Sequence, residues 1–254
     1  MTTQPSPEII LYDLASTKNV CFSPVVWRIR LILNYKQIPY QTIFLEFPDI
    51  EPTLSALGLP PHPPDTTTNP PKPPKHAYTV PAIYHLPTST YLMDSLPITH
   101  FLNTTYPTPP LSPPTPQTAL LEAQLRAVAG PPTFRSVVPR ELRILAPRAQ
   151  EYFRRTREPG LGGLRVEDLL RGEEEAWEGA REGLEKVDGV VRELRERGGG
   201  RFVGGERPGV VDFLVAGGLR SMWTVEEGLL ERYRGMEGIL GVYEACLPWM
   251  ERCT

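Results

Sequence analysis

The spacing of apolar and polar residues differs on the two sides of a proline-rich stretch in the middle of the chain. In the first part, the run 24–36 places apolar residues three or four positions apart, as a helix does. It lies between two strand-like runs at 8–14 and 40–46. A strand, a helix and a strand in this order predict a βαβ unit whose two strands are parallel.

Further elements follow in the same part. A short helical stretch spans 49–58, two more strand-like runs cover 78–85 and 90–93, and a helix begins near Asp94. The full order, βαβ then αββα, is the thioredoxin-like arrangement.

The second part of the chain has helical spacing throughout, with apolar positions three or four apart and charges between them. Only "RFVGG" (201–205) could be a strand, and Pro131 with Pro132 is expected to interrupt the first helix. The helical runs are 117–130, 139–158, 173–197, 210–223 and 225–233. The sequence therefore predicts an all-α domain here, at 118–254.

Prolines mark the boundaries between these parts. The chain has 30 prolines, concentrated at 59–76 and just after residue 105, where they preclude a helix or a central strand. We interpret 59–76 as a surface insertion within an α/β domain at 8–106, and 107–117 as a linker to the helical domain. Residues 1–7 are expected to form a flexible N-terminus.

Composition narrows the possible functions. With 27 basic and 30 acidic side chains, the net charge of −3 provides no positive field for nucleic acid or an anionic membrane. Three cysteines (Cys21, Cys246 and Cys253) are too few for a disulfide framework, and no run approaches the ~20 apolar residues that span a bilayer. We expect a cytoplasmic protein without a metal site, whose partners are small molecules or a second copy of the chain.

The stretch "VCFSPVVW" (20–27) contains two candidate reactive groups. Pro24 suits the first position of a helix, which makes Ser23 the natural N-cap and places its hydroxyl at the positive end of the helix dipole. On spacing alone, a plain helix cap is the simpler explanation of Ser23. The same helix end could lower the pKa of the Cys21 thiol, but a buried cysteine is the commoner case and Cys21 lies outside the capping position.

Two further motifs could bind a ligand. In "TVPAI" (79–83), Pro81 indicates a sheet edge, a bulge or a cis bond, and a cis bond would leave the backbone of Val80 available to an extended peptide. Asp94 and Ser95 begin a helix, where they could act as caps or hold the charged end of a ligand.

Together these motifs resemble the cytosolic glutathione transferases over roughly residues 8 to 250. The likeness is strongest to the fungal etherase-related and FuA-type serine transferases, whose first helix starts Ser-Pro-x-x-Trp, here at Ser23, Pro24 and Trp27. Other shared features are "FPDIE" (47–51), a proline-rich insertion before "TVPAI", "MDSLPITHFL" (93–102) and "EYFRRTRE" (151–158).

The resemblance implies a glutathione site and a role for each motif. Ser23 would be the catalytic residue beside the sulfur, Val80 and Pro81 would pair with the cysteinyl part, and Asp94 with Ser95 would bind the γ-glutamyl end. The glycine carboxylate has only loop candidates, Lys72, Lys75 and His76, and each of them is more simply explained as a solvated loop residue. The resemblance also implies a homodimer.

An electrophile pocket is expected between the two domains. Candidates for its walls are Tyr12 and Phe22 from the first domain and Phe134, Arg135 and Trp223 from the second. Ordinary packing between helices is the simpler explanation for Phe134, Arg135 and Trp223.

The leading hypothesis is a glutathione transferase that activates the glutathione thiol for attack on a hydrophobic electrophile, in fungal small-molecule biosynthesis or detoxification, with ether cleavage as a variant. A second hypothesis is a glutathione-dependent cis/trans isomerase that adds the thiol reversibly to a conjugated double bond. A third is a non-catalytic, transferase-like regulatory module.

Overall fold

The computed structural model describes residues 6–64, 66–67, 70 and 72–252. Within them, four strands form one sheet in the order β2-β1-β3-β4. The strands are β1 (Ile9–Leu14), β2 (Tyr40–Leu45), β3 (Ala82–His85) and β4 (Thr90–Met93). β1 and β2 are parallel, which confirms the predicted βαβ unit, and the other neighbouring pairs are antiparallel.

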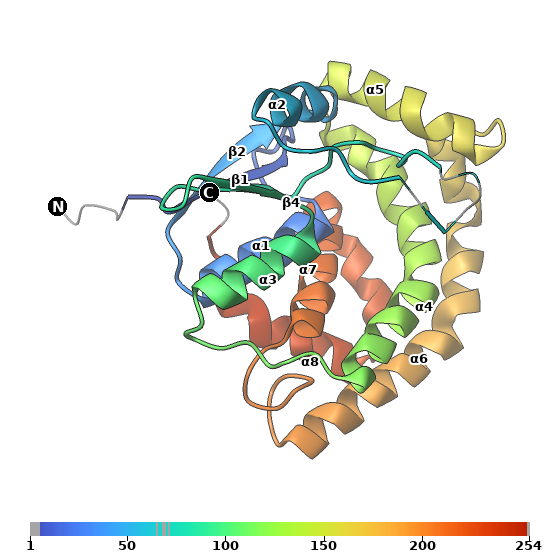
Figure 1. Ribbon diagram of the computed structural model, residues 1–254. Coiled ribbons are helices and arrows are strands. Elements are labelled where there is room, and N and C mark those ends of the chain that lie inside the picture. Colours follow the sequence, from blue (N-terminus) through green and yellow to red (C-terminus); the bar gives the residue numbers. More distant parts are fainter. Residues whose placement is uncertain (1–5, 65, 68–69, 71, 253–254) are drawn as a thin grey trace.

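Three helices accompany this sheet. They are α1 (Pro24–Tyr35), α2 (Ile50–Ala56) and α3 (Ser95–Thr105). Figure 1 shows α1 and α3 side by side on one side of the sheet, with α2 on the opposite side. The predicted thioredoxin-like arrangement is confirmed.

The rest of the described chain is helical, as predicted. Its helices are α4 (Pro116–Glu141), α5 (Pro147–Arg157), α6 (Glu173–Gly198), α7 (Val210–Val225) and α8 (Glu237–Cys246). The two long helices α4 and α6 run side by side along one edge of the molecule in Figure 1. None of the helices in the described ranges combines the length and the apolar character needed to cross a membrane.

The predicted interruption at Pro131 and Pro132 is wrong, because α4 continues through both prolines and through Pro139. Each internal proline removes one backbone hydrogen bond and crowds the preceding turn. Leu121 and Leu125 before the prolines and Val137 after them are buried. Packing against α6 and α7 on both sides of the prolines therefore holds α4 together.

Three other expectations for the helical part need correction. The run 139–158 divides, because α4 ends at Glu141 and Pro147 begins α5 at a position that needs no N–H. The run 225–233 forms 3₁₀ turns over Glu227–Tyr233, and α8 was not predicted. The possible strand at 201–205 is a turn closed by a single bridge between Phe202 and Gly205.

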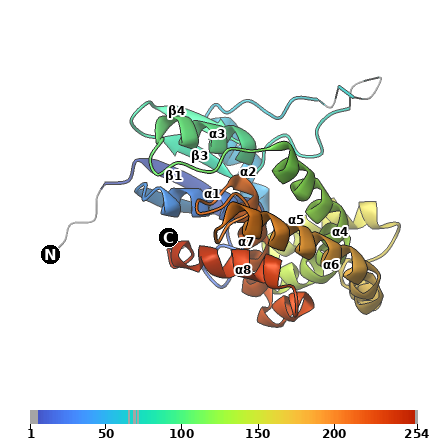
Figure 2. The same ribbon diagram turned by 90° about the horizontal axis from the view of Figure 1, so that it is seen from below.

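The two parts of the molecule meet along α1. In Figure 2, α1 lies between the sheet and α7. The backbones of α1 and α7 approach closely at Gly217, where a Cβ atom would lie 3.1 Å from the carbonyl oxygen of Pro24 and 3.1 Å from Cβ of Trp27. A larger residue would push the helices apart, so this contact positions the start of α1.

A buried ion pair lies on the sheet side of α1. Arg30 Nη2 donates to Asp13 Oδ2 at 2.8 Å, and both side chains are fully buried. Arg30 also donates to Tyr40 and Thr42 on β2. Because removing one partner would leave an uncompensated buried charge, the pair specifies how α1 sits on β1 and β2.

Candidate functional site

Ser23 caps α1 and is buried, with 4% of its surface exposed. Its Oγ accepts a hydrogen bond from Val26 N at 3.5 Å, which is at the long limit for such a bond. The predicted N-cap is confirmed. Because the hydroxyl only accepts in this bond, its hydrogen is available to a ligand at the positive end of the helix.

Two hydrogen bonds from different helices hold the loop before Ser23. Trp27 Nε1 donates to the Cys21 carbonyl oxygen at 3.0 Å, and the Ser221 hydroxyl of α7 donates to the Phe22 carbonyl oxygen. The Cys21 side chain is fully buried. Cys21 therefore belongs to the packing of the loop, and the loop presents Ser23.

The peptide bond between Val80 and Pro81 is cis, one of the three arrangements that the sequence allowed. The Pro81 carbonyl oxygen accepts from Asp94 N at 3.1 Å, which ties this turn to the start of α3. Within the described part of the chain, neither the N–H nor the C=O of Val80 has a hydrogen-bond partner. An extended peptide backbone could pair with both groups.

Asp94 has φ 79° and ψ 140°, a conformation that non-glycine residues rarely adopt. Such a conformation costs of order 1–3 kcal/mol, and outliers of this kind cluster at ligand sites. Ser95 follows at the first position of α3, is 7% exposed, and has its Oγ 3.5 Å from Asp94 Oδ1. The turn brings Asp94 and Ser95 next to Pro81.

A cleft of about 460 Å³ opens beside Ser23 and Val80. The basic residues on its wall are Lys75, His76 and, from α5, Arg157, whereas the exposed Lys72 does not line it. Burial lowers the pKa of His76, helped by Arg157 and Lys75, so His76 is neutral at pH 7.

Arg157 was not among the candidates from the sequence. Its guanidinium carbon lies 3.8 Å from the ring centre of Phe153 and 4.9 Å from that of Phe47, and it makes no ion pair within the described residues. Burial lowers its pKa, although an arginine remains charged at pH 7. A cation held between rings in a cleft and lacking a carboxylate partner is suited to an anionic ligand.

A second cavity, of about 350 Å³, lies on the other side of Val25, which lines both. Its walls come from α1, α4 and α7 and are mostly apolar. The charged residues on its wall are Arg28, Arg126 and Glu141.

The predicted electrophile-binding residues are not brought together. Phe134 lines the second cavity and is 47% exposed. Tyr12 and Phe22 are buried, with 5% and 0% of their surface exposed. Arg135 donates to the Leu169 carbonyl oxygen at 2.8 Å, and Trp223 packs 4.1 Å from the guanidinium of Arg220. Apart from Phe134, these residues line neither cavity: Tyr12 and Phe22 belong to the buried core, and Arg135 and Trp223 are engaged by other residues.

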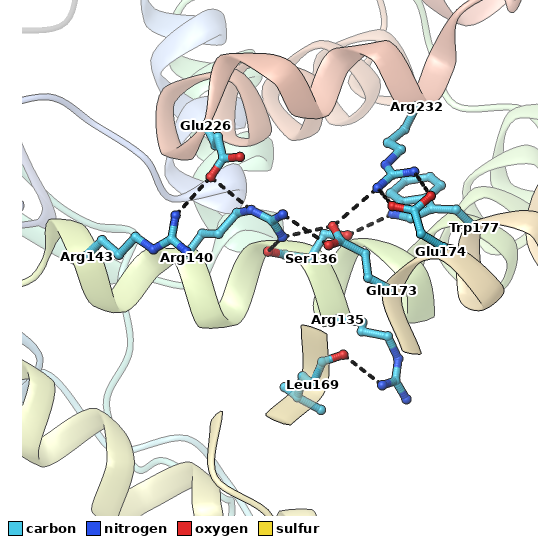
Figure 3. A network of polar contacts seen from close by, with 10 residues as sticks. All are labelled: Arg135, Ser136, Arg140, Arg143, Leu169, Glu173, Glu174, Trp177, Glu226 and Arg232. Carbon is cyan, nitrogen blue, oxygen red and sulfur yellow. Dashed lines mark hydrogen bonds and ion pairs between the residues drawn. The ribbon is translucent and has the colours of Figure 1, made fainter. Parts of the chain in front are cut away.

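A polar network fixes the C-terminal end of α4 behind the second cavity (Figure 3). Arg140 donates to both carboxylate oxygens of Glu173 at 2.8 and 3.0 Å and to Glu226 at 2.9 Å. Trp177 Nε1 of α6 donates to the Ser136 hydroxyl of α4 at 2.8 Å. These contacts join α4 to α6 and to the end of α7.

Comparison with known proteins agrees with this fold. Residues 22–105 match the N-terminal domain of glutathione S-transferases, and residues 117–237 match their C-terminal domain. The glutathione S-transferase-like protein ustS of Aspergillus flavus is 35% identical over 230 residues, which are 84% of this chain and 79% of that protein.

Solved structures give the same result. Glutathione transferase GSTFuA2 of Phanerochaete chrysosporium superposes with a TM-score of 0.80 at 29% identity, covering 98% of this chain and 100% of that one. A glutathione S-transferase of Ceriporiopsis subvermispora, solved in complex with glutathione, superposes with a TM-score of 0.77 at 25% identity, covering 95% and 97%. The chain belongs to the glutathione S-transferase family.

Proposed function

We propose that this chain is a glutathione transferase that binds glutathione in the cleft at Ser23 and activates its thiol for attack on an apolar electrophile. One observation carries the proposal: Ser23 at the start of α1 and Val80 beside the cis proline line the same cleft. A thiol-containing peptide needs a donor to its sulfur and a backbone to pair with, and this cleft offers both.

The reaction requires the thiolate, because a thiol with a pKa near 8.5 is mostly protonated at neutral pH. The Ser23 hydroxyl would donate a hydrogen bond to the sulfur, and the N-terminus of α1 would add its positive potential. Both favour the charged form and lower the pKa of the thiol. Ser23 stabilises the nucleophile without becoming covalently attached.

The rest of the tripeptide would extend along groups on both sides of Ser23. The Val80 N–H and C=O would pair with the cysteinyl part, and Asp94 with Ser95 would bind the amino and carboxylate groups of the γ-glutamyl end. The glycine carboxylate would lie against the cationic wall formed by Lys75 and Arg157. Of these groups, Arg157 has the geometry for bidentate recognition of a carboxylate.

The apolar cavity on the other side of Val25 would hold the electrophile. In a conjugation reaction, the sulfur forms a bond to carbon and stays on the product. The physiological role, in small-molecule biosynthesis or detoxification, stays a prediction.

The same thiolate could serve an isomerase, in which glutathione adds to a conjugated double bond, allows rotation and leaves. Mass spectrometry of the product separates the two reactions, because conjugation adds the mass of glutathione whereas isomerisation changes only the geometry. A chain that binds glutathione without turning over either kind of substrate would be the non-catalytic module.

Thermal unfolding with and without glutathione tests the proposal. At a ligand concentration of about 100 Kd, binding should stabilise the fold by ~2.7 kcal/mol and raise Tm. The matched control is γ-glutamyl-alanyl-glycine, which lacks the thiol. It should also raise Tm, but only bound glutathione should show the ultraviolet absorbance of a thiolate at neutral pH. If glutathione leaves Tm unchanged and no conjugate forms, the proposal is wrong.

A further inference from the structure

Glu141, the last residue of α4, is a carboxyl group on the wall of the apolar cavity that the proposed reaction leaves unused. It is half-buried, and its carboxyl makes no hydrogen bond or ion pair within the described part of the chain. Its oxygens are not among the sealed polar atoms that lack a partner, so they remain accessible. An accessible, unpaired carboxyl in an apolar cavity is unusual, and it is available to form a hydrogen bond with a bound ligand.

The cations nearest to Glu141 in the sequence are held by other carboxylates. Figure 3 shows Arg140 bound by Glu173 and Glu226, and Arg143 bound by Glu226 at 3.3 Å. Because both arginines point into that network, they do not neutralise Glu141.

The charged groups of the neighbouring elements are engaged as well. On α1 and α4, Arg28 and Arg126 both pair with Glu122, at 3.5 and 2.8 Å. On α5, Arg157 is close enough to attract Glu141 electrostatically but makes no ion pair with it. The remaining titratable group on the cavity wall is the phenol of Tyr233, whose pKa is raised to about 12 by burial, so it is neutral.

Burial raises the pKa of Glu141 to about 7, and the attraction of Arg157 only partly opposes it. Near neutral pH, about half of the molecules therefore carry a protonated carboxyl at this position, and a group with a pKa close to the working pH is best suited to donate a proton.

We propose that Glu141 donates a proton to an α,β-unsaturated carbonyl compound bound in the apolar cavity. The inference rests on the proposed function, because the nucleophile is the glutathione thiolate. It adds a catalytic residue on the side of the electrophile.

The step balances as follows. The thiol of glutathione loses its proton to water, and the thiolate electron pair forms a carbon–sulfur bond at the β-carbon. The π electrons of the carbon–carbon double bond move toward the carbonyl oxygen and form an enolate. The carboxylic acid of Glu141 donates a hydrogen bond to that oxygen and then gives up its proton to the enolate, and the carboxylate regains a proton from water.

The chemistry of the cavity favours a carbonyl over a substrate with an anionic leaving group. The cations on the wall, Arg28 and Arg126, already pair with Glu122, so the wall stabilises a departing anion poorly, whereas one neutral acid can receive the charge that develops on a carbonyl oxygen. Ligand sites are often mostly apolar, with a few polar groups that fix the orientation of the ligand. In this cavity, the carboxyl of Glu141 could orient the one polar atom of a mostly apolar ligand.

Two probes with different proton requirements test the proposal. Benzylideneacetone needs a proton after the thiolate adds, whereas chlorodinitrobenzene loses chloride and needs none. In Glu141→Gln, we expect kcat/KM for benzylideneacetone to fall about 100-fold and that for chlorodinitrobenzene to stay within about twofold. The matched control is Glu151→Gln, an exposed carboxylate on α5, which should change neither rate.

The ratio of the two rates gives a second readout, because both reactions share the same thiolate and its pKa cancels. For the wild type, the ratio of benzylideneacetone to chlorodinitrobenzene turnover should fall about tenfold for each pH unit above about 7. The Glu141→Gln ratio should not depend on pH. A protein that has merely lost part of its fold would lose both activities together and leave the ratio unchanged.

The outcomes separate this inference from the proposed function. If glutathione raises Tm but Glu141→Gln turns over benzylideneacetone like the wild type, or loses both probes equally, the role of Glu141 is overturned and the transferase proposal stands. If the wild type conjugates chlorodinitrobenzene but not benzylideneacetone, the substrate class is wrong. If glutathione does not bind at all, both proposals fail.

Discussion

The two cavities on either side of Val25 share one wall and differ in almost everything else. The cleft at Ser23 is lined by a helix N-terminus, backbone groups beside a cis proline, and the cationic residues Lys75 and Arg157. The second cavity is lined mainly by apolar side chains of α1, α4 and α7. The first suits a polar, charged peptide, and the second suits an apolar molecule.

The difference lies in where the polar groups come from. In the cleft they are placed largely by local structure, namely a cap, a turn and the start of a helix. In the second cavity they depend on the packing of helices that are far apart in the sequence, and this packing leaves the carboxyl of Glu141 without a partner.

The largest expected effect concerns Glu141 and the stability of the second cavity. Its pKa is about 7 in the folded state against 4.5 in the unfolded chain, so the protonated carboxyl stabilises the fold below pH 4.5 and this contribution is lost as the pH rises through about 7. Between about pH 4.5 and about pH 8, the free energy of unfolding measured with urea should fall by up to about 3 kcal/mol more in the wild type than in Glu141→Gln. Equal pH dependence in both proteins would contradict the burial of this carboxyl.

The next effect concerns the sulfur end of the cleft. Ser23→Ala would remove the proposed hydrogen bond to the charged sulfur, a loss of about 1.5–3 kcal/mol, so kcat/KM with glutathione should fall about 10- to 100-fold. The pH at which the absorbance of the bound thiolate appears should rise. Cys21→Ala is the control, because the Cys21 side chain faces the core and turnover should stay within about twofold. A larger loss in Cys21→Ala than in Ser23→Ala would overturn the assignment.

A smaller effect is expected at the other end of the cleft. Arg157→Gln removes the cation that we propose binds the glycine carboxylate, so glutathione should bind about tenfold more weakly, with little change in kcat. Titration calorimetry and steady-state kinetics measure the two quantities. Lys72→Gln removes an exposed charge outside the cleft and should leave binding unchanged. If Lys72→Gln weakens binding more than Arg157→Gln, the carboxylate lies elsewhere.

The smallest effect should come from the contact that positions the loop before Ser23. Ser221→Ala leaves the buried Phe22 carbonyl without its donor from α7, which should cost about 1 kcal/mol of unfolding free energy and lower turnover about twofold. The Thr224 hydroxyl bonds within α7 to the Arg220 carbonyl oxygen, so Thr224→Ala should leave turnover unchanged. An unchanged stability in Ser221→Ala would show that α7 does not hold this loop.

Much of the fold follows from short-range signals, and the exceptions have a physical cause. Ser23 before Pro24 predicted the cap of α1, and the alternation of apolar residues predicted the strands. Pro131 and Pro132 predicted a break that packing against α6 and α7 overrides. Periodicity also failed at α8, which was not predicted at all.

Which side chains line the second cavity was harder still to predict from the sequence. Aromatic and charged residues between two helices suggested a pocket wall, but a side chain on a helix can face any of several neighbours. Arg135 turns to the Leu169 carbonyl and Trp223 to Arg220, whereas Glu141 and Arg157, which had drawn no attention, face the cavities. No local signal distinguishes these cases.

The sequence by itself determined the strands, most of the helices, their order and the cap at Ser23, because capping, proline geometry and turn chemistry act within a few residues. The tertiary structure alone decided which side chains meet in the second cavity, and that α1 and α7 approach each other at Gly217. It also decided that Arg140 forms an ion pair with Glu173, whereas the carboxyl of the adjacent Glu141 is unpaired among the described residues. Burial and pairing depend on residues distant in the chain, so the pKa of a carboxyl is a property of the fold.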